Sequence, residues 1–319
     1  MVNNYNFHNN FHKPVLLDEV IKNLQIQEGE IYVDGTFGAG GYSAAILNSK
    51  NCTLYSFDRD SNVIKFADNL KEKYQNRFRF INDKFSNMKQ SLNDLGVDKV
   101  DGIVLDIGVS SMQLDENQRG FSFNSSAKLD MRMDNNSGIS AFDVVNQKSE
   151  LELSKIIKDL GEEKKHRQIA KKIVLARQEK EITTALDLAQ IVRDIYGKYN
   201  PKKIDPATKT FQAIRIFVND ELGELEKVLD QSLELLKKGG RLLVVSFHSL
   251  EDSYVKKFMR KNSGYDDRNI SRYDPANLLE KNNQYQFSLP ILKAIKPSKS
   301  EIEDNSRARS SRLRIAIKN

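Results

Sequence analysis

The sequence predicts an α/β protein built on a doubly wound, mostly parallel sheet. In the first third of the chain, short apolar segments alternate with amphipathic helical segments. A glycine-rich turn at residues 35–41 also joins the first of these strands to a helix. Strands that alternate with helices form parallel sheets through right-handed crossovers. A strand–turn–helix unit of this kind places its turn where such sheets bind ligands.

Composition sets the broad class. The 319 residues are 39% hydrophobic and 29% charged, which is typical of one large or two ordinary globular domains. No apolar run approaches the roughly 18 residues that a membrane span needs, and the N-terminus lacks a signal-peptide pattern. The single cysteine, Cys52, excludes an internal disulfide. We therefore expect a cytoplasmic protein with no membrane partner.

A formal net charge of +6 favours a polyanionic partner such as RNA, although a basic protein need not bind one. Basic residues gather in two clusters, one on a predicted helix and one near the C-terminus: Lys164, Lys165, Arg167, Lys171, Lys172 and Arg177, and then Arg307, Arg309, Arg312 and Arg314. Both could follow phosphates, and the helix cluster could equally be a solvated face. The four histidines show no metal-ligand spacing, so no metal site is predicted.

The first half of the chain gives a regular alternation. A helix at 14–24 comes first, opened by Pro14. Strands are then expected at 31–34, 53–58, 78–82 and 101–106, separated by helices at 42–49, 61–74 and 86–95. The fourth strand is almost wholly apolar, as expected of a strand that is buried on both faces.

After Asp106 the alternation stops, and the next strand pattern is at 241–246. Between them we expect helices at 150–160, 163–179 and 184–196, and a long helical stretch from Pro206 to Lys237. A helix at 251–261 and strands at 287–289 and 313–317 complete seven strands. We therefore predict a main domain of residues 1–136 and 201–319, with an inserted helical subdomain at 137–200. Seven strands suit the sheet of S-adenosylmethionine-dependent methyltransferases better than a six-stranded dinucleotide-binding sheet.

The glycine turn indicates the cofactor class. A dinucleotide site requires G-x-G-x-x-G, but Gly38 and Gly40 are followed by Gly41, Tyr42 and Ser43, so the third glycine is missing. This favours S-adenosylmethionine over a nicotinamide cofactor and over a turn that binds nothing. The carboxylate before the turn, Asp34, is expected to hold the cofactor's ammonium group, directly or through water. Asp58, after the second strand, is expected to accept hydrogen bonds from ribose hydroxyls.

The end of the fourth strand carries the candidate catalytic residues, Asp106 and Ser110. Their oxygens could accept hydrogen bonds from an exocyclic amine, whose lone pair is otherwise delocalised into its ring. In-line positioning of the amine would supply much of the remaining rate enhancement. Asp106 could instead only cap a loop.

Two other stretches are candidates for the substrate site. Phe121, Phe123 and Met131 could wall a flipped base or simply anchor a long loop. His248, after the fifth strand, could contact a phosphate or a base. No Ser-His-Asp arrangement that would indicate a hydrolase is visible.

Several motifs together resemble one family, the bacterial 16S ribosomal RNA cytosine-N4 methyltransferases. They cover nearly the whole chain in family order, at residues 12–17, 34–41, 58–60, 106–111, 119–123, 129–134, 210–215, 246–252 and 307–311.

The resemblance implies methyl transfer from S-adenosylmethionine to N4 of a cytidine in the decoding region of 16S rRNA. The expected partner is 16S rRNA or the small ribosomal subunit, and a monomer or homodimer is expected. The cofactor contacts implied by position are Gly40, Gly41, Tyr42, Asp58, Phe85, Asp106 and Gln113. Substrate contacts are expected from Phe121, Phe123, Arg132, Arg215, His248, Arg307 and Arg309. The family often has histidine where Tyr42 stands, which puts a side-chain role at that position in doubt.

Two other functions remain open from the sequence. A nicotinamide-dependent oxidoreductase would need hydride-transfer residues that are not recognisable here. A non-enzymatic RNA-binding assembly factor with a vestigial crevice would keep its role without Asp106.

Overall fold

The computed structural model describes residues 14–110, 113, 119–135, 137–197, 204–265 and 285–319. Its centre is a seven-stranded sheet in the order β3-β2-β1-β4-β5-β7-β6. The strands are β1 (Ile31–Asp34), β2 (Thr53–Phe57), β3 (Phe78–Ile81), β4 (Val100–Asp106), β5 (Leu236–Ser246), β6 (Phe287–Ser288) and β7 (Arg312–Lys318). The predicted seven-stranded α/β fold is confirmed.

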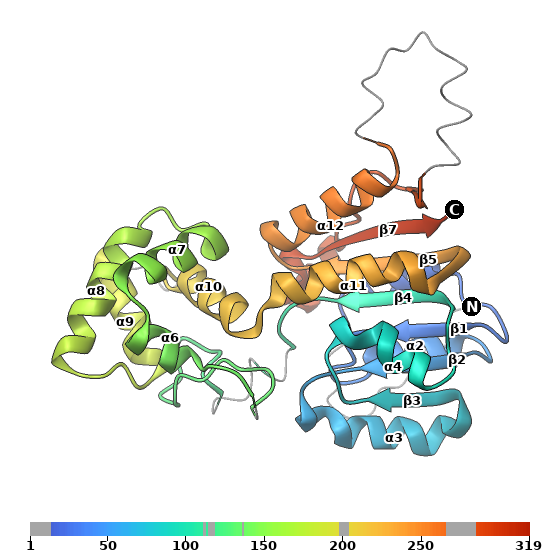
Figure 1. Ribbon diagram of the computed structural model, residues 1–319, viewed down its shortest axis with the longest axis horizontal. Coiled ribbons are helices and arrows are strands. Elements are labelled where there is room, and N and C mark those ends of the chain that lie inside the picture. The colour runs from blue at the N-terminus through green and yellow to red at the C-terminus, as the bar shows by residue number, and fades with distance from the viewer. Residues whose placement is uncertain (1–13, 111–112, 114–118, 136, 198–203, 266–284) are drawn as a thin grey trace, which may run out of the picture. The chain divides into compact units, whose positions relative to one another are not determined.

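Strand directions follow the prediction of a mostly parallel sheet. The strands β1 to β5 pair in parallel, and β7 is antiparallel to both β5 and β6. In Figure 1 the arrowheads of β1 to β4 accordingly point one way and that of β7 the other. The side chains of Ile103, Val104 and Leu105 in β4 are all fully buried, because helices cover both faces of a central parallel strand.

Four helices connect the first strands: α1 (Leu17–Leu24), α2 (Gly41–Ser49), α3 (Ile64–Tyr74) and α4 (Met88–Asp94). One face of the sheet packs on α4, α11 (Glu221–Leu235) and α12 (Ser249–Asn262) in a shared apolar cluster. That cluster includes Met88 and Leu92 from α4, Leu225 and Val228 from α11, and Val255 and Met259 from α12. None of the helices within the described ranges is long and apolar enough to cross a membrane.

The helical region contains α6 (Ala141–Gln147), α7 (Glu150–Gly161), α8 (His166–Glu179), α9 (Ala185–Tyr196) and α10 (Thr208–Asn219). Three of these helices begin at capping boxes. Ser140, Ser149 and Thr184 each accept a hydrogen bond from a main-chain N–H one turn into the helix. Ser140, Ser149 and Thr184 thus cap α6, α7 and α9.

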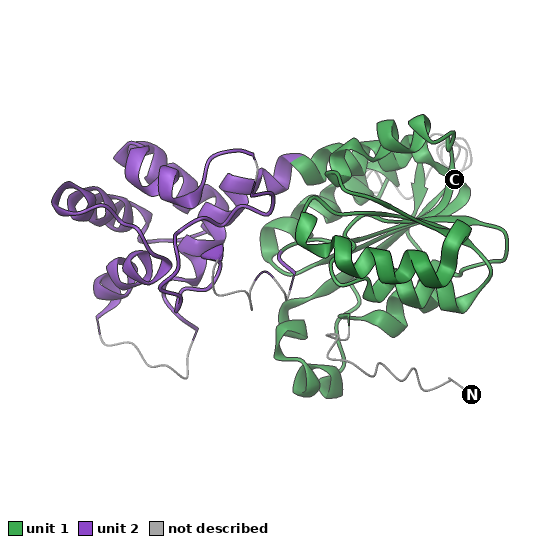
Figure 2. Cartoon of the chain, turned by 90° about the horizontal axis from the view of Figure 1, so that it is seen from below, with its two compact units in different colours: residues 1–108, 224–319 green, residues 109–223 purple. Residues whose placement is uncertain are grey.

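The chain divides into two compact units, residues 1–108 with 224–319 and residues 109–223 (Figure 2). The second unit is larger than the predicted insertion at 137–200. Its core combines Phe121 and Leu129 from the loop after β4 with Phe211 and Ile214 from α10, so the flanking segments belong with the helices. These segments join the second unit because their side chains are buried in its core. The local periodicity of the sequence does not indicate this burial.

The helical stretch predicted from Pro206 to Lys237 is two helices. It breaks at Asp220, whose φ of 48° is left-handed and ends α10, and α11 begins at Glu221. Helix α10 packs in the 109–223 unit, and the second half of α11 packs under the sheet. The expectation that the whole stretch belongs to the main domain is wrong for its first half.

Replacing Gly161 by alanine tests the packing of α7 on α10. A Cβ atom at Gly161 would lie 2.5 Å from the Lys209 carbonyl oxygen and 3.1 Å from Ala213 Cβ. We expect Gly161→Ala to destabilise the helical unit by about 2 kcal/mol, because an overpacked contact forces the helices apart. Urea unfolding followed by circular dichroism measures this. Helix propensity alone would make alanine stabilising, so a gain in stability would contradict the packing argument.

Candidate functional site

Three aspartates end three neighbouring strands of the sheet. Asp34 ends β1 and Asp106 ends β4, while Asp58 follows β2 directly. These strands are adjacent and parallel in the order β2-β1-β4, so their carboxyl ends meet at one edge of the sheet. The chain crosses from one half of a doubly wound sheet to the other here, which is where such sheets bind ligands.

Asp34 holds the turn that follows β1. Its Oδ1 accepts a hydrogen bond from the Thr36 N–H at 3.1 Å, and its Oδ2 accepts one from the Ser43 hydroxyl at 2.6 Å. The side chain is fully buried, and burial raises its pKa to about 6. The carboxylate therefore supports the turn from within. Its expected contact with a cofactor's ammonium group, direct or through water, stays a prediction.

Glycines let the turn lie close to β4. A Cβ atom at Gly35 would lie 2.4 Å from Leu105 Cδ2. At Gly40, φ is +79° and a Cβ would lie 2.9 Å from the Phe37 ring. The Asp106 N–H donates a hydrogen bond to the Thr36 hydroxyl at 2.6 Å, which ties the turn to the end of β4. A side chain at Gly35 would therefore displace the turn from the strand that carries Asp106, and one at Gly40 would displace the Phe37 ring within the turn.

Asp58 faces the same turn. Its Oδ2 accepts a hydrogen bond from the Gly38 N–H at 2.8 Å and its Oδ1 accepts one from the Asp60 N–H at 2.9 Å. Burial raises the pKa of Asp58 to about 6, although these two hydrogen bonds lower it. Phe85 lies beside the turn too, with its Cβ 3.6 Å from the position of a Gly35 Cβ. Three of the predicted cofactor residues, Gly40, Asp58 and Phe85, thus surround one turn.

Asp106 carries an unsatisfied buried oxygen. Its Oδ1 has no hydrogen-bond partner among the described residues. Burial raises the pKa of Asp106 well above its ordinary value, and the charges of Asp34 and Glu251 add to the rise. A buried acceptor without a donor is costly, so this oxygen is suited to a donor or a cation supplied from outside the chain.

Tyr42 turns its side chain away from the turn. It is 3% exposed, and its hydroxyl donates a hydrogen bond to the Val15 carbonyl oxygen. Burial raises its pKa well above the ordinary value. Only main-chain groups of Tyr42 are therefore suited to contact a ligand. Because such contacts do not depend on the side chain, they can be made by tyrosine as well as by the histidine that is frequent in the family.

Ser110 and Gln113 contact one another. The Ser110 N–H donates to Gln113 Oε1 at 3.1 Å, and the Gln113 N–H donates to the Ser110 hydroxyl at 3.2 Å. Both residues belong to the 109–223 unit, whereas the three aspartates belong to the other. The catalytic role of Ser110 and the cofactor contact of Gln113 stay predictions.

The aromatic residues considered as walls for a base are packed inside the 109–223 unit. Phe121 is 6% exposed and Met131 is 1% exposed, both within its apolar core. The Phe123 ring meets Phe211 edge-on, with ring centres 5.9 Å apart. This packing favours the alternative that these residues anchor the long loop.

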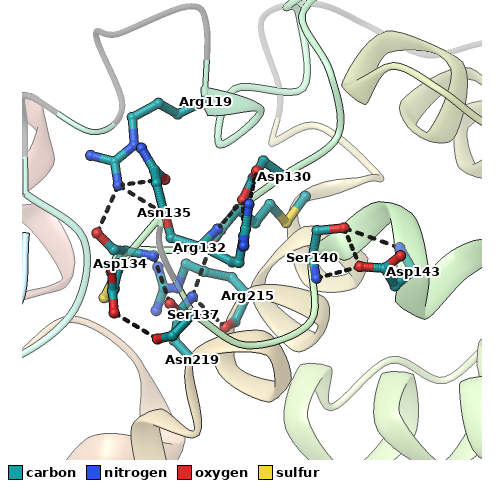
Figure 3. Close-up of polar contacts among 12 residues, drawn as sticks. Arg119, Asp130, Arg132, Asp134, Asn135, Ser137, Ser140, Asp143, Arg215 and Asn219 are labelled. Atoms are coloured by element: carbon teal, nitrogen blue, oxygen red, sulfur yellow. Dashed lines mark hydrogen bonds and ion pairs between the residues drawn. The ribbon is translucent and has the colours of Figure 1, made fainter.

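A polar network holds the same loop (Figure 3). The Arg119 guanidinium donates hydrogen bonds of 2.8 Å to the main-chain oxygens of Arg132 and Met133. The buried amide of Asn219, on α10, accepts from the Met133 N–H and donates to the Met131 oxygen, both at 2.8 Å. Both side chains make the loop part of the helical unit.

Two arginines predicted to contact RNA are held in ion pairs. Arg132 makes two hydrogen bonds of 2.8 Å to Asp130, and Arg215 makes two of 2.8 Å to Glu221. A carboxylate on each guanidinium reduces the charge available to a phosphate. Their role as substrate contacts stays a prediction.

His248 caps a helix. Its Nδ1 accepts a hydrogen bond from the Glu251 N–H at 3.4 Å at the start of α12, and its Nε2 lies 2.9 Å from Glu251 Oε1. These contacts give the side chain a structural role at the end of β5. A contact with substrate stays a prediction.

The C-terminal basic cluster is smaller than the sequence suggested. Arg312 and Arg314 both bind the Asp252 carboxylate, at 2.7 and 2.6 Å, and that carboxylate is buried. The other two arginines, Arg307 and Arg309, lie on a 3₁₀ turn (Ser306–Ser310), where Arg309 is exposed. On α8, Lys172 and Arg177 likewise bind groups of their own unit.

Sequence reasoning missed three residues that shape the turn. Thr36 and Ser43 flank the glycines, and their hydroxyls bind Asp106 and Asp34. Thr36 stands two positions after the strand-ending Asp34, which was the available signal for that residue. Glu301 is hydrogen-bonded to Leu16, far away in the sequence, so no local pattern could indicate it.

The chain is similar to known proteins along nearly its whole length. A family model described as the MraW methylase family matches residues 9–319. A relative from Orientia tsutsugamushi, named "Ribosomal RNA small subunit methyltransferase H", is 50% identical over 313 residues, covering 97% of this chain and 99% of the relative. A relative of the same name from Maricaulis maris is 50% identical over 309 residues, covering 97% and 91%.

Among solved structures, a putative methyltransferase from Streptococcus mutans in complex with SAH aligns with 97% of this chain and 100% of its own, at 10% identity and a TM-score of 0.41. The family model and the two relatives each extend over nearly all of the sequence. This chain belongs to the MraW methylase family.

Proposed function

We propose that this chain transfers a methyl group from S-adenosylmethionine to the exocyclic N4 of a cytidine in the decoding region of 16S rRNA. Family membership and the names of the relatives support methylation of small-subunit ribosomal RNA. The choice of cytidine N4 rests on the motif resemblance. The observation that carries the proposal is the buried, unpartnered Oδ1 of Asp106, at the edge of the sheet where Asp58 and the glycine turn also lie.

The electrostatics of this edge fit a cationic cofactor. Burial raises the pKa of Asp34 and of Asp58 to about 6, and Asp106 is shifted in the same direction. A ligand that carries sulfonium and ammonium charges would stabilise these carboxylates, whereas the pyrophosphate of a nicotinamide cofactor would be repelled by them. The same edge therefore disfavours the oxidoreductase alternative.

In this proposal individual groups of the site have separate roles toward S-adenosylmethionine. Asp58 would accept hydrogen bonds from the ribose hydroxyls, and Phe85 would flank the adenine. The main chain at Gly40, Gly41 and Tyr42 would contact the amino-acid end. When bound, S-adenosylmethionine supplies an activated methyl group. Asp106 would accept a hydrogen bond from the amine N–H of the cytosine, holding the nitrogen lone pair in line for attack.

RNA would be bound by exposed basic residues. Arg309 is exposed on its 3₁₀ turn, and Lys164, Arg167 and Lys171 are exposed around α8. Affinity for RNA should therefore fall steeply with salt.

The direct test of the function is transfer of a labelled methyl group to 16S rRNA, offered naked and in small subunits, followed by mass mapping of the product nucleotide. No incorporation into either form would refute the proposal.

Asp106→Asn tests the catalytic assignment. The amide keeps the size of the side chain but removes the negative charge, so we expect kcat to fall by about 100-fold or more. Methyl transfer at saturating S-adenosylmethionine, with adenosylhomocysteine affinity measured separately, distinguishes lost catalysis from lost binding. A wild-type kcat would exclude the catalytic role of Asp106. If the protein instead acts in cells as a non-enzymatic assembly factor, that role is excluded as well.

Gly40→Ala tests the cofactor turn. The alanine would carry a left-handed φ and press on Phe37, so we expect adenosylhomocysteine to bind at least about tenfold more weakly. Gly96→Ala is the matched control, since Gly96 has a φ of +75° but nothing within 4 Å of its would-be Cβ. Calorimetric titration should find the control's affinity unchanged. Equal affinities for both variants would place the cofactor elsewhere.

The pKa of Asp58 predicts a pH dependence of cofactor binding. The ionised carboxylate accepts ribose hydroxyls, while the protonated form loses acceptor capacity. As pH falls through about 6, where Asp58 takes up its proton, affinity should therefore fall. We expect roughly tenfold weaker binding of adenosylhomocysteine at about pH 5 than at about pH 7.5. Asp58→Asn should bind more weakly at both values, with a shallower slope. A slope identical to that of the wild type would exclude Asp58 as its source.

A further inference from the structure

We propose that Glu301 is a positioning residue for the cofactor turn, acting through the segment of residues 14–16. Glu301 lies on the short helix α14 (Lys299–Asp304), and its Oε1 accepts a hydrogen bond from the Leu16 N–H at 2.6 Å. The contact joins the last part of the chain to the first described segment. The proposal rests on the proposed placement of the cofactor at Gly40, Gly41 and Tyr42.

Residues 14–16 lie directly against that turn. The Pro14 Cγ atom is 2.2 Å from the position that a Cβ at Gly41 would take, so the ring occupies the space left by the glycine. The Tyr42 hydroxyl donates to the Val15 carbonyl oxygen, and both side chains are buried. Two of the three proposed main-chain cofactor contacts are therefore held by this segment.

Leu16 needs an acceptor from outside its own helix. It precedes the first residue of α1, has a left-handed φ of 55° and is fully buried. Its N–H therefore has neither water nor a helical carbonyl as an acceptor. The Glu301 carboxylate supplies one, and a hydrogen bond to an ionised acceptor is among the stronger kinds. Ser298 orients Glu301 in turn, since its hydroxyl accepts from the Glu301 N–H at 3.1 Å.

The tether also leads to the arginine-bearing turn. Helix α14 ends at Asp304, and the 3₁₀ turn with Arg307 and Arg309 begins at Ser306. Asn305 joins them by accepting a hydrogen bond from the Arg307 N–H at 3.1 Å. Helix α14 thus connects the arginine turn to Leu16. Glu301 is the group through which the C-terminal segment sets cofactor affinity.

Three variants of the full chain test this role. Glu301→Ala removes the acceptor, so we expect adenosylhomocysteine to bind about tenfold more weakly. The KM for S-adenosylmethionine should rise in proportion, while kcat at saturation stays near that of the wild type. Glu301→Gln keeps an acceptor oxygen and should restore affinity to within about threefold. Glu303→Ala, on the same helix at an exposed position, is the matched control and should leave affinity unchanged.

The outcomes separate the tether from the cofactor site. Wild-type affinity in Glu301→Ala, when Gly40→Ala binds weakly, would overturn the tether alone. Normal binding by both variants would overturn the proposed cofactor placement instead. A Gln variant as weak as the Ala variant would overturn the hydrogen-bond argument.

If Glu301→Ala does not fold, Glu301→Asp takes its place, because it keeps the charge and shortens the reach by one methylene. Binding weaker than that of the Gln variant at a similar melting temperature supports the tether. Wild-type affinity refutes it.

Discussion

The close approach of the glycine turn to β4 is the constraint on which the rest of the site depends. The turn can lie over Leu105 because residue 35 has no side chain, and the Thr36 hydroxyl then reaches the Asp106 N–H. Asp34 holds the turn from the buried side through Thr36 and Ser43. Asp58 and Asp106 are brought to the same edge of the sheet in this way, although they stand 48 positions apart in the sequence.

Burying several carboxylates at one edge is unfavourable for the isolated chain. Desolvation raises the pKa of all three aspartates, and the charges of Asp34 and Glu251 act further on Asp106. Such an edge is stabilised by a ligand that brings positive charge, and a donor to the buried Asp106 oxygen would satisfy it as well. Instability of the empty edge and affinity for a cationic methyl donor thus have the same physical origin.

Both units use arginines to stabilise their own fold. In the unit of residues 109–223, conspicuous arginines such as Arg132 and Arg215 are held by carboxylates, and Arg119 fastens the long loop. Asp252 binds two arginines of β7 in the other unit. Many of the basic residues that suggested RNA binding therefore stabilise the fold, so the net charge overstates the number of cations available to phosphate.

The sequence by itself determined the seven strands, their order along the chain and the glycine turn, because these depend on residue type and on spacing within a few positions. It also placed Asp58 and Asp106 at strand ends. Only the tertiary structure decided that Asp34 is buried under the turn, that α10 packs with the inserted helices, and that Glu301 binds Leu16. These features depend on which side chains become neighbours after distant segments pack together, and no local pattern records that.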